Sequence, residues 1–370
     1  MKETLKKKHV FFPIGLGLCI FLLTILFAFF YTKHSSFNNL PRVSSSSLHE
    51  TYIPKSLTLD QIFSDNHTFV EKLPSDHIGI LTVTGDIIPA RSVNAGVMRK
   101  NNPLWPYEKV SPILKSLKSD ITFVNLETPL IPNCPVTEEG MVFCGDQKNV
   151  DGLKSINVSV ANLANNHAGN YQAIGVEATV KLLKENGILV AGINGPVYKN
   201  IKGVTFAFLG YNDITKPQPG IVNTDESTIK KDIQEAKKHA DVVVVQYHWG
   251  VEYRDQPDER QIYLGRFTID NGADLVIGNH PHWIQPIEFY KGKLITYAHG
   301  NFVFDQMWSQ KTREGVVGRY VFYDKTLIDV EYLPLQIDDY GQPHFVESEQ
   351  KKQILADMKN NSIMLKEHTK

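Results

Sequence analysis

The sequence lacks several features that would assign it to a class at once. Its 370 residues include three cysteines, too few for a disulfide scaffold. Its 39 lysines and arginines are balanced by 40 aspartates and glutamates, so no basic field is available for a nucleic acid. No internal repeat is visible, and 42% hydrophobic with 21% charged residues excludes wholesale disorder, collagen and coiled coil. What remains is a globular chain of one large domain or two.

One long hydrophobic run, residues 10–31, contains no charged residue. At about 1.5 Å per residue it spans a hydrocarbon core of roughly 30 Å. It is longer than the apolar part of a cleaved signal peptide, which is the alternative, and it ends in bulky residues. Because lysines stay in the cytoplasm, we predict a single-pass signal-anchor in the cell membrane, with residues 1–9 inside and the C-terminal part outside. The lysines are Lys2, Lys6, Lys7 and Lys8.

The part after the anchor divides into three segments. Residues 32–76 are rich in serine and proline and predict a tether, with a short helix within 57–73. Residues 77–345 predict an α/β domain, because β-branched runs alternate with helical patterns, and residues 346–370 form a tail. The predicted strands are Ile78–Thr84, Asp120–Val124, Val158–Ala161, Ile188–Ala191, Val204–Leu209, Asp241–Tyr247, Ala273–Ile277 and Leu294–Tyr297. The predicted helices are Tyr107–Lys118, Tyr171–Asn186, Glu226–His239 and Asp258–Asn271.

Cys134 and Cys144 lie in one loop that contains proline and glycine. If the domain is exported, a disulfide between them is chemically allowed and would contribute about 2–3 kcal/mol. Two unpaired thiols are the alternative. A metal role is not favoured, because neither a histidine nor a third cysteine lies close to them in sequence.

Five predicted strands run into polar clusters at their C-terminal ends. Open α/β sheets bind their ligands at that edge, so we expect these side chains to converge. The clusters are Gly85-Asp86, Asn125-Leu126-Glu127, Asn165-Asn166-His167, His248-Trp249-Gly250 and Gly278-Asn279-His280-Pro281-His282. Each cluster alone is equally typical of a turn or a loop, and only their joint occurrence indicates a site.

The side chains of these clusters are typical metal ligands. Imidazole suits zinc and iron, whereas carboxylate and amide oxygens suit manganese. More than four ligands exceed one tetrahedral zinc and predict two ions, about 3.5–4 Å apart. His280 and His282 are expected on the same side of an extended strand end. Gly85 and Gly278 are expected to let the backbone turn sharply.

The order of these clusters resembles the CapA family, which comprises membrane-anchored poly-γ-glutamate capsule synthesis proteins with a calcineurin-like metallophosphoesterase fold. The resemblance covers roughly residues 78–335 and includes Gly272-Ala273-Asp274 and Gly300-Asn301-Phe302-Val303-Phe304-Asp305. It implies a two-sheet αββα sandwich preceded by one transmembrane helix. It also implies divalent metal ions, two of them, of manganese, zinc or iron.

The resemblance also implies a role for each site residue. The implied metal ligands are Asp86, Glu127, Asn166, His248, His280 and His282. His167 is the implied acid, with a structural role orienting Asn166 as the alternative. Asn165, Asn301 and Asp305 are implied to order the loops that carry the ligands.

Three positions leave alternatives open. Arg91 either clamps a carboxylate or phosphate or pairs with an acid of the domain, such as Glu127. Asp86-Ile87-Ile88 lacks the histidine of the Asp-x-His pattern, so one metal is expected to be weakly held or missing. His299 is either a polar group at the rim of the site or a harmless substitution.

The function that follows is a membrane-anchored component of poly-γ-glutamate capsule biosynthesis with a metal-dependent hydrolase or transferase site. One alternative is a non-catalytic subunit that binds or exports the polymer, and another is a generic exported phosphodiesterase. The expected partners are poly-γ-glutamate or its precursor and other membrane subunits of a capsule synthase. No nucleic acid is expected.

Overall fold

The structure is a computed structural model that describes residues 57–214, 218 and 220–368. The chain divides into two units, residues 1–55 and 56–370. The predicted cytoplasmic segment, the predicted anchor at residues 10–31 and the first part of the predicted tether lie outside the described residues. Within the described residues, no helix combines the length and apolar character needed to cross a membrane.

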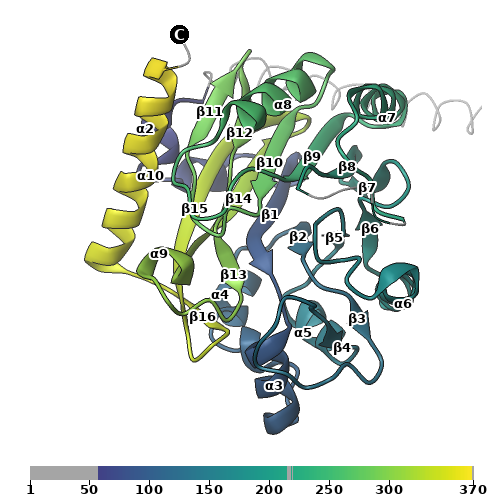
Figure 1. The fold of residues 1–370 in the computed structure, drawn as a ribbon. Helices are drawn as coiled ribbons and strands as arrows, with labels where there is room; N and C mark the ends of the chain where they lie inside the picture. The colour runs from purple at the N-terminus through teal and green to yellow at the C-terminus, as the bar shows by residue number, and fades with distance from the viewer. Residues whose placement is uncertain (1–56, 215–217, 219, 369–370) are drawn as a thin grey trace, which may run out of the picture. The chain divides into compact units, whose positions relative to one another are not determined.

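The first sheet joins parallel strands from the start of the domain to antiparallel strands from its end (Figure 1). In spatial order it contains β16 (Gln342–Phe345), β15 (Thr326–Asp338), β14 (Glu314–Tyr323), β1 (Ile78–Ile87), β2 (Ile121–Leu126), β5 (Val160–Asn162) and β6 (Leu189–Ala191). A further strand, β13 (Asn301–Val303), pairs with the end of β1. The pairs from β1 through β6 are parallel, whereas β14, β15 and β16 run antiparallel to their neighbours.

The second sheet is also mixed. In spatial order it contains β11 (Ile287–Tyr290), β12 (Lys293–Thr296), β10 (Leu275–Asn279), β9 (Val242–His248), β8 (Val204–Asn212) and β7 (Val197–Ile201). Two short strands, β3 (Leu130–Ile131) and β4 (Gly145–Asp146), pair separately at the base of a loop.

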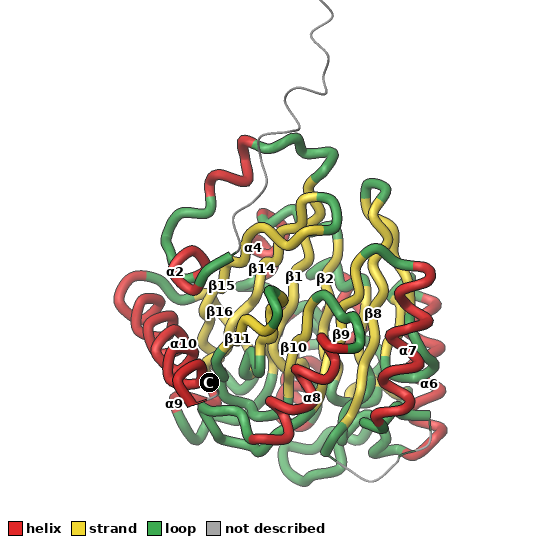
Figure 2. The backbone as a smooth tube through the Cα atoms, turned by 90° about the horizontal axis from the view of Figure 1, so that it is seen from above, coloured by secondary structure: helices red, strands yellow, loops and turns green. Residues whose placement is uncertain are grey.

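Helices lie against the outer faces of both sheets (Figure 2). The α-helices are α2 (Leu59–Ile62), α3 (Arg91–Lys100), α4 (Ser111–Ser116), α5 (Asn149–Ser155), α6 (Gln172–Glu185), α7 (Glu226–His239), α8 (Glu259–Asp270), α9 (Gln310–Arg313) and α10 (Ser348–His368). Two 3₁₀ turns are η3 (Thr68–Lys72) and η4 (Trp105–Tyr107).

The four consecutive valines of β9 show how the layers arise. Successive side chains of a strand point to opposite faces. Val242 and Val244 therefore enter the core between the two sheets, whereas Val243 and Val245 pack under α7 and α8. A strand buried on both faces reads as a continuous apolar run, as this one does. The predicted α/β sandwich of two sheets is confirmed.

The eight predicted strands are all present, and three predicted helices match α6, α7 and α8. Asp225 caps α7 by accepting a hydrogen bond from the backbone of Thr228, 2.8 Å away. The helix predicted over Tyr107–Lys118 is present but shorter, because Tyr107 ends η4 and α4 covers only Ser111–Ser116. Pro112 lies in the first turn of α4, where its missing N–H is tolerated, and it cannot continue a helix from before.

The predicted sharp turns at Gly85 and Gly278 are also wrong. Gly85 lies within β1 and Gly278 within β10, and neither has a positive φ. Both are needed because a neighbouring backbone approaches closely. A Cβ at Gly85 would lie 2.2 Å from the carbonyl oxygen of Gly300, and one at Gly278 would lie 1.9 Å from that of Tyr297.

Both ends of the described chain pack on the sandwich. Ile62 of α2 is buried in the core between the sheets, within the segment predicted as a tether. Ile354 and Met358 of α10 join the same core, within the segment predicted as a tail. In addition, the hydroxyl of Ser362 accepts a hydrogen bond of 3.0 Å from the backbone N–H of Ile287, on the edge strand β11. The helix thereby covers an otherwise open sheet edge.

Candidate metal centre

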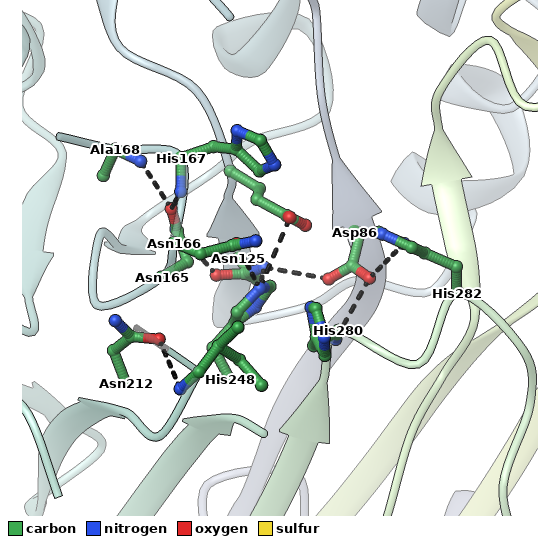
Figure 3. A network of polar contacts seen from close by, with 12 residues as sticks. Asp86, Asn125, Asn165, Asn166, His167, Ala168, Asn212, His248, His280 and His282 are labelled. Atoms are coloured by element: carbon green, nitrogen blue, oxygen red, sulfur yellow. Dashed lines mark hydrogen bonds and ion pairs between the residues drawn. The ribbon is translucent and has the colours of Figure 1, made fainter. Parts of the chain in front are cut away.

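Five buried side chains meet at the carboxyl ends of β1 and β2 of the first sheet and of β9 and β10 of the second. Asp86 lies near the end of β1, Glu127 follows β2, and His248 ends β9. His280 and His282 follow β10, and none of the five is more than 4% exposed. Figure 3 shows the three histidines and Asp86 directed toward one region. The convergence expected from the strand ends is therefore present.

The extended conformation expected for the two histidines after β10 is wrong. His280 has φ 99° and His282 has φ 58°, so the backbone turns through the left-handed region at both. This turn, rather than strand alternation, brings both imidazoles to the site. The backbone N–H of His280 lies 3.3 Å from Asp86 Oδ2, to which it donates a hydrogen bond that holds the turn.

Potential ligand atoms form two groups that share one carboxylate. Glu127, His280 and His282 form one group, and Asp86, Glu127 and His248 form the other. Within each group one atom from every residue lies within 4.8 Å of the others. A carboxylate common to both groups lies where it could bridge two cations.

The carboxylate of Glu127 is the clearest indication that this donor set fits cations. The residue is fully buried, and neither oxygen has a hydrogen-bond donor among the described residues. His248 Nε2 lies 3.3 Å from Oε1, but it is directed to Asn166 Oδ1 at 2.8 Å. A buried carboxylate without a donor is costly, and burial together with the charge of Asp86 raises the pKa of Glu127 well above its ordinary value. Bound cations would remove that cost.

The other groups divide into one ion pair and two neutral imidazoles. His282 Nδ1 lies 3.2 Å from Asp86 Oδ2. Burial opposes ionisation of both, but their mutual interaction outweighs it, lowering the pKa of Asp86 and raising that of His282 to about 9. Burial lowers the pKa of His248 to about 3 and that of His280 well below its ordinary value. Neutral imidazoles and carboxylates are the forms that bind metal ions, so His248 and His280 are in the binding form and His282 would lose one proton on binding a cation.

His167 lies beside the centre with a defined tautomer. Asn170 Oδ1 accepts a 2.6 Å hydrogen bond from the backbone N–H of Phe143 and lies 2.9 Å from His167 Nδ1. Because that oxygen is an acceptor, Nδ1 must carry the proton, which leaves the lone pair on Nε2. Burial lowers the pKa of His167 to about 4, so the ring is neutral near pH 7.

Three amides organise the loops around the ligands. Asn165 Oδ1 accepts hydrogen bonds from the backbones of His167 and Ala168, at 3.2 and 2.8 Å. Asn125 Nδ2 lies 2.8 Å from Asp86 Oδ1, and Asn165 Nδ2 lies 3.2 Å from Asn125 Oδ1. Asn301 Oδ1 accepts from His282 Nδ1 at 2.9 Å. These contacts hold ligands in place without occupying every ligand atom.

Arg91 forms an ion pair with Asp305, which is one of the two interpretations left open by the sequence. Its partner is Asp305 rather than Glu127. Asp305 also accepts a 3.1 Å hydrogen bond from the backbone N–H of Ser92, at the start of α3. The guanidinium carbon lies 4.8 Å from the ring centre of Phe143 and 4.9 Å from that of Phe304. Three side chains thus hold Arg91 beside the site.

Two further predicted positions have clear places in the structure. Cys134 and Cys144 form a disulfide, with their Cα atoms 5.9 Å apart. His299 is fully buried and its Nε2 lies 3.0 Å from the hydroxyl of Tyr320, so it does not lie at the rim of the site. Sequence reasoning assigned no role to Asn125, Phe143 or Asn170. Asn125 lies one residue before the end of β2, in a polar cluster that the sequence already shows, and could have been found, whereas Phe143 lies in a loop without any pattern.

Comparisons with known proteins identify the family of the chain. Residues 80–306 match the family described as "Bacterial capsule synthesis protein PGA_cap". The capsule biosynthesis protein CapA of Bacillus anthracis is 34% identical over 72% of this chain and 69% of its own length. The PGA biosynthesis protein CapA of Bacillus subtilis is 34% identical over 72% of this chain and 74% of its own.

One solved structure, a phosphatase from Mycoplasma pneumoniae, is 12% identical over 71% of this chain and 95% of that protein, with a TM-score of 0.47. At these values the likeness supports no conclusion of its own. The family match covers more than half of the chain, and both Bacillus relatives are covered over more than two thirds of their length. The chain therefore belongs to the bacterial capsule synthesis protein family PGA_cap.

Proposed function

We propose that this chain is a metal-dependent hydrolase or transferase in poly-γ-glutamate capsule production, anchored by residues 10–31 at the outer face of the cell membrane. The names of the Bacillus relatives support the capsule role. The hydrophobic run after four lysines supports the anchor. The single observation that supports catalysis is Glu127, a fully buried carboxylate that has no hydrogen-bond donor among the described residues and belongs to both ligand groups.

The residues that would hold the ions are Asp86, Glu127, Asn166, His248, His280 and His282. When bound, two divalent ions supply a Lewis acid for an oxygen of the substrate and a more acidic bound water. All of these side chains except Asn166 are at most 4% exposed, so little bulk water competes with a substrate for the centre. A phosphoester, an acyl phosphate and the γ-amide bond all fit this chemistry.

His167 moves a proton in this proposal. Asn170 holds the proton on Nδ1, so the neutral ring accepts one at Nε2 and returns it in a later step. A proton returned to a leaving oxygen is the acid role implied by the family resemblance. Burial lowers the pKa of His167 to about 4, so at neutral pH the ring is unprotonated at Nε2, the atom that would take up the proton.

Metal analysis of the purified full chain tests the metal site directly. We expect transition metal to co-purify or to be taken up on titration with manganese or zinc. His280→Ala combined with His282→Ala should reduce that uptake at least about tenfold, because the centre loses two imidazoles. His239→Ala changes an exposed histidine and is the matched control. A wild-type chain that binds neither metal would contradict the proposal.

The same pair of variants in a capsule-forming host separates catalysis from passive polymer binding. We expect polymer amount or length to change with His280→Ala and His282→Ala while the folded protein remains at normal abundance. Normal polymer from a folded variant that has lost its metal would exclude catalysis at this site. Manganese-dependent cleavage of a chromogenic phosphodiester, with normal capsule, would instead favour a generic exported phosphodiesterase.

A further inference from the structure

A loop closed by a disulfide reaches the candidate site. We define the Cys134–Cys144 loop as residues 134–144. At its base, β3 and β4 pair in parallel, and the disulfide joins the two ends of the loop, with Cys144 directly before β4. Val136, Met141 and Val142 of this loop are each more than half exposed. The loop tip therefore has little packing of its own to hold it.

Between the two buried cysteines, one residue of this loop is buried, and it contacts His167. The ring of Phe143 is 2% exposed and stacks on the His167 imidazole, with ring centres 3.9 Å apart and an interplanar angle of 18°. Phe143 directly precedes Cys144, so the disulfide fixes the backbone at this point. A stacked aromatic pair of this kind is stabilised beyond the area that it buries.

The backbone of Phe143 makes a second connection to the same imidazole. Its N–H donates to Asn170 Oδ1, and that oxygen accepts the Nδ1 proton of His167. If the Phe143 N–H moved away, the Asn170 amide could rotate and present its NH₂ group instead. Nδ1 would then have to be the acceptor, and the proton would move to Nε2. The loop backbone thus selects which nitrogen of His167 can accept a proton.

Arg91 holds the opposite side of the same loop. Its Nη1 lies 3.3 Å from the carbonyl oxygen of Gly140, and its guanidinium lies against the rings of Phe143 and Phe304. Asp305 fixes the guanidinium in turn. The buried end of the loop is therefore fastened by the disulfide, by Arg91 and by Asn170, while its tip stays exposed.

We infer that the disulfide-closed Cys134–Cys144 loop positions His167, with Phe143 as the positioning residue. Phe143 fixes the plane of the imidazole by stacking, and its N–H fixes the tautomer through Asn170. This inference rests on the proposed role of His167 in proton transfer. It also gives a function to the disulfide, whose two cysteines are not among the potential metal ligands of the described residues.

The tautomer is the direct readout, and it needs neither metal nor substrate. Long-range proton–nitrogen NMR correlations on the full chain, labelled with ¹⁵N-histidine, report which ring nitrogen carries the proton. We expect a single Nδ1–H form for His167 in the wild type. Cys134→Ser with Cys144→Ser should give a mixture of both forms, as should reduction of the wild type. A single unchanged form in both cases would overturn the inference, whatever the activity.

Kinetics of the manganese-loaded chain, with a chromogenic phosphodiester as the probe, give the second readout. We expect Phe143→Leu, which keeps an apolar side chain but loses the flat ring, to lower kcat about 10- to 100-fold with KM changed less than about twofold. Phe143→Tyr, which keeps the ring, should restore most of kcat. Met141→Ala, at the exposed tip, is the matched control. Metal uptake should be unchanged in all of them, because the loop contributes no ligand.

These outcomes separate the two proposals. If the wild type has no activity but its tautomer depends on the disulfide, the positioning role stands and the catalytic proposal fails. If the enzyme is active and Phe143→Leu matches the wild type in kcat, the positioning role fails and the catalytic proposal stands.

Discussion

Single residues of the centre combine an electrostatic cost with a capacity to bind cations, and Glu127 shows this most clearly. Its carboxylate is buried without a donor among the described residues, while Glu288, another buried carboxylate, is hydrogen-bonded by Arg266 at 2.8 Å and Tyr297 at 2.6 Å. The two residues have the same side chain and similar burial but opposite environments. The same substitution at Glu127 and at Glu288 therefore compares a buried carboxylate without a donor with one that has donors.

We expect Glu127→Gln to stabilise the metal-free protein and to abolish binding of at least one ion. Removing a buried, unpartnered charge should raise the free energy of unfolding by about 1–2 kcal/mol at pH 8. Glu288→Gln should instead lower it by about 1–3 kcal/mol, because its partners lose a charged acceptor. Chemical denaturation in a chelator measures both effects, and elemental analysis measures the ions. A Glu127→Gln variant that is less stable than the wild type and fully metallated would contradict this prediction.

The same substitution should change the dependence of stability on pH. Because the pKa of Glu127 is raised in the folded state, the native chain holds this proton where the unfolded chain has lost it. Its contribution to stability therefore falls as pH rises above 4.5, the ordinary value, toward the folded-state pKa. The advantage of Glu127→Gln over the wild type should accordingly be small at pH 5 and largest at pH 8. Denaturant titrations across this range measure it, and an advantage that shrinks as pH rises would contradict the expected sign.

The site residues differ in how far the sequence could predict them. The site role of Asp86, Glu127 and His248 could be predicted from their position, because polar residues at the carboxyl ends of buried strands lie at the edge where ligands bind. Phe143 could not be predicted, because its contact with His167 depends on how a loop without periodicity folds back. The pairing of Arg91 with Asp305 joins residues far apart in the chain, and an arginine near several acids does not indicate which one it meets.

At the scale of elements, the segment before β1 is fastened to β15 by a histidine. His67 Nδ1 lies 2.8 Å from Asp329 Oδ1, and His67 Nε2 lies 3.0 Å from the carbonyl oxygen of Ser64. Burial alone would lower the pKa of His67, but the hydrogen bond and charge of Asp329 outweigh it, so the pKa is raised. The contact is therefore strongest with a protonated imidazole.

We expect this segment to loosen as the pH rises. A raised pKa gives a contribution that is fully present below 6.5, the ordinary value, and that is lost as pH rises through the folded-state pKa. The segment should lose about 1 kcal/mol of local stability. After correction for intrinsic exchange rates, this appears as a several-fold fall in hydrogen-exchange protection over residues 59–72. His67→Gln should remove the pH dependence. Equal hydrogen-exchange protection of residues 59–72 below and above the folded-state pKa of His67 in the wild type would contradict this prediction.

Helices and strands could be predicted from the sequence where one or both of their faces are apolar. β9 and α7 have clear periodicity and defined ends, and sequence reasoning placed both within one residue. β14 and β15 were missed although they form a long hairpin, because their alternation is interrupted by Gly318 and Pro334. Gly318 leaves room for the ring of Tyr320 on the same strand, a reason that only the packing reveals.

At the scale of the whole molecule, α10 links the two sheets of the sandwich. It packs against β11 of the second sheet and β15 of the first. Met358 is 2% exposed and belongs to the core between the sheets, whereas Met364 on the same helix is 48% exposed. The helix is therefore part of the folded domain.

We expect Met358→Ala to lower the free energy of unfolding by about 2–4 kcal/mol, because it leaves a cavity between the sheets. Met364→Ala should stay within about 0.5 kcal/mol of the wild type. Metal uptake should be unchanged in both, since α10 contributes no ligand. Denaturant titrations measure the difference, and equal effects of the two substitutions would show that α10 does not belong to the core.

The pairing of β1 with β14 has a consequence for the order in which this protein forms. β1 carries Asp86, yet its antiparallel neighbour comes from near the other end of the domain, with Ile80 opposite Val321. Contacts between such distant segments slow folding, because the entropy cost of closing a long loop comes before the contacts can stabilise the chain. Because the ribosome releases the N-terminus first, β1 stays without this neighbour until residues 314–323 have been synthesised. The centre is therefore assembled late, which gives chaperones a long interval in which to act on the incomplete sandwich.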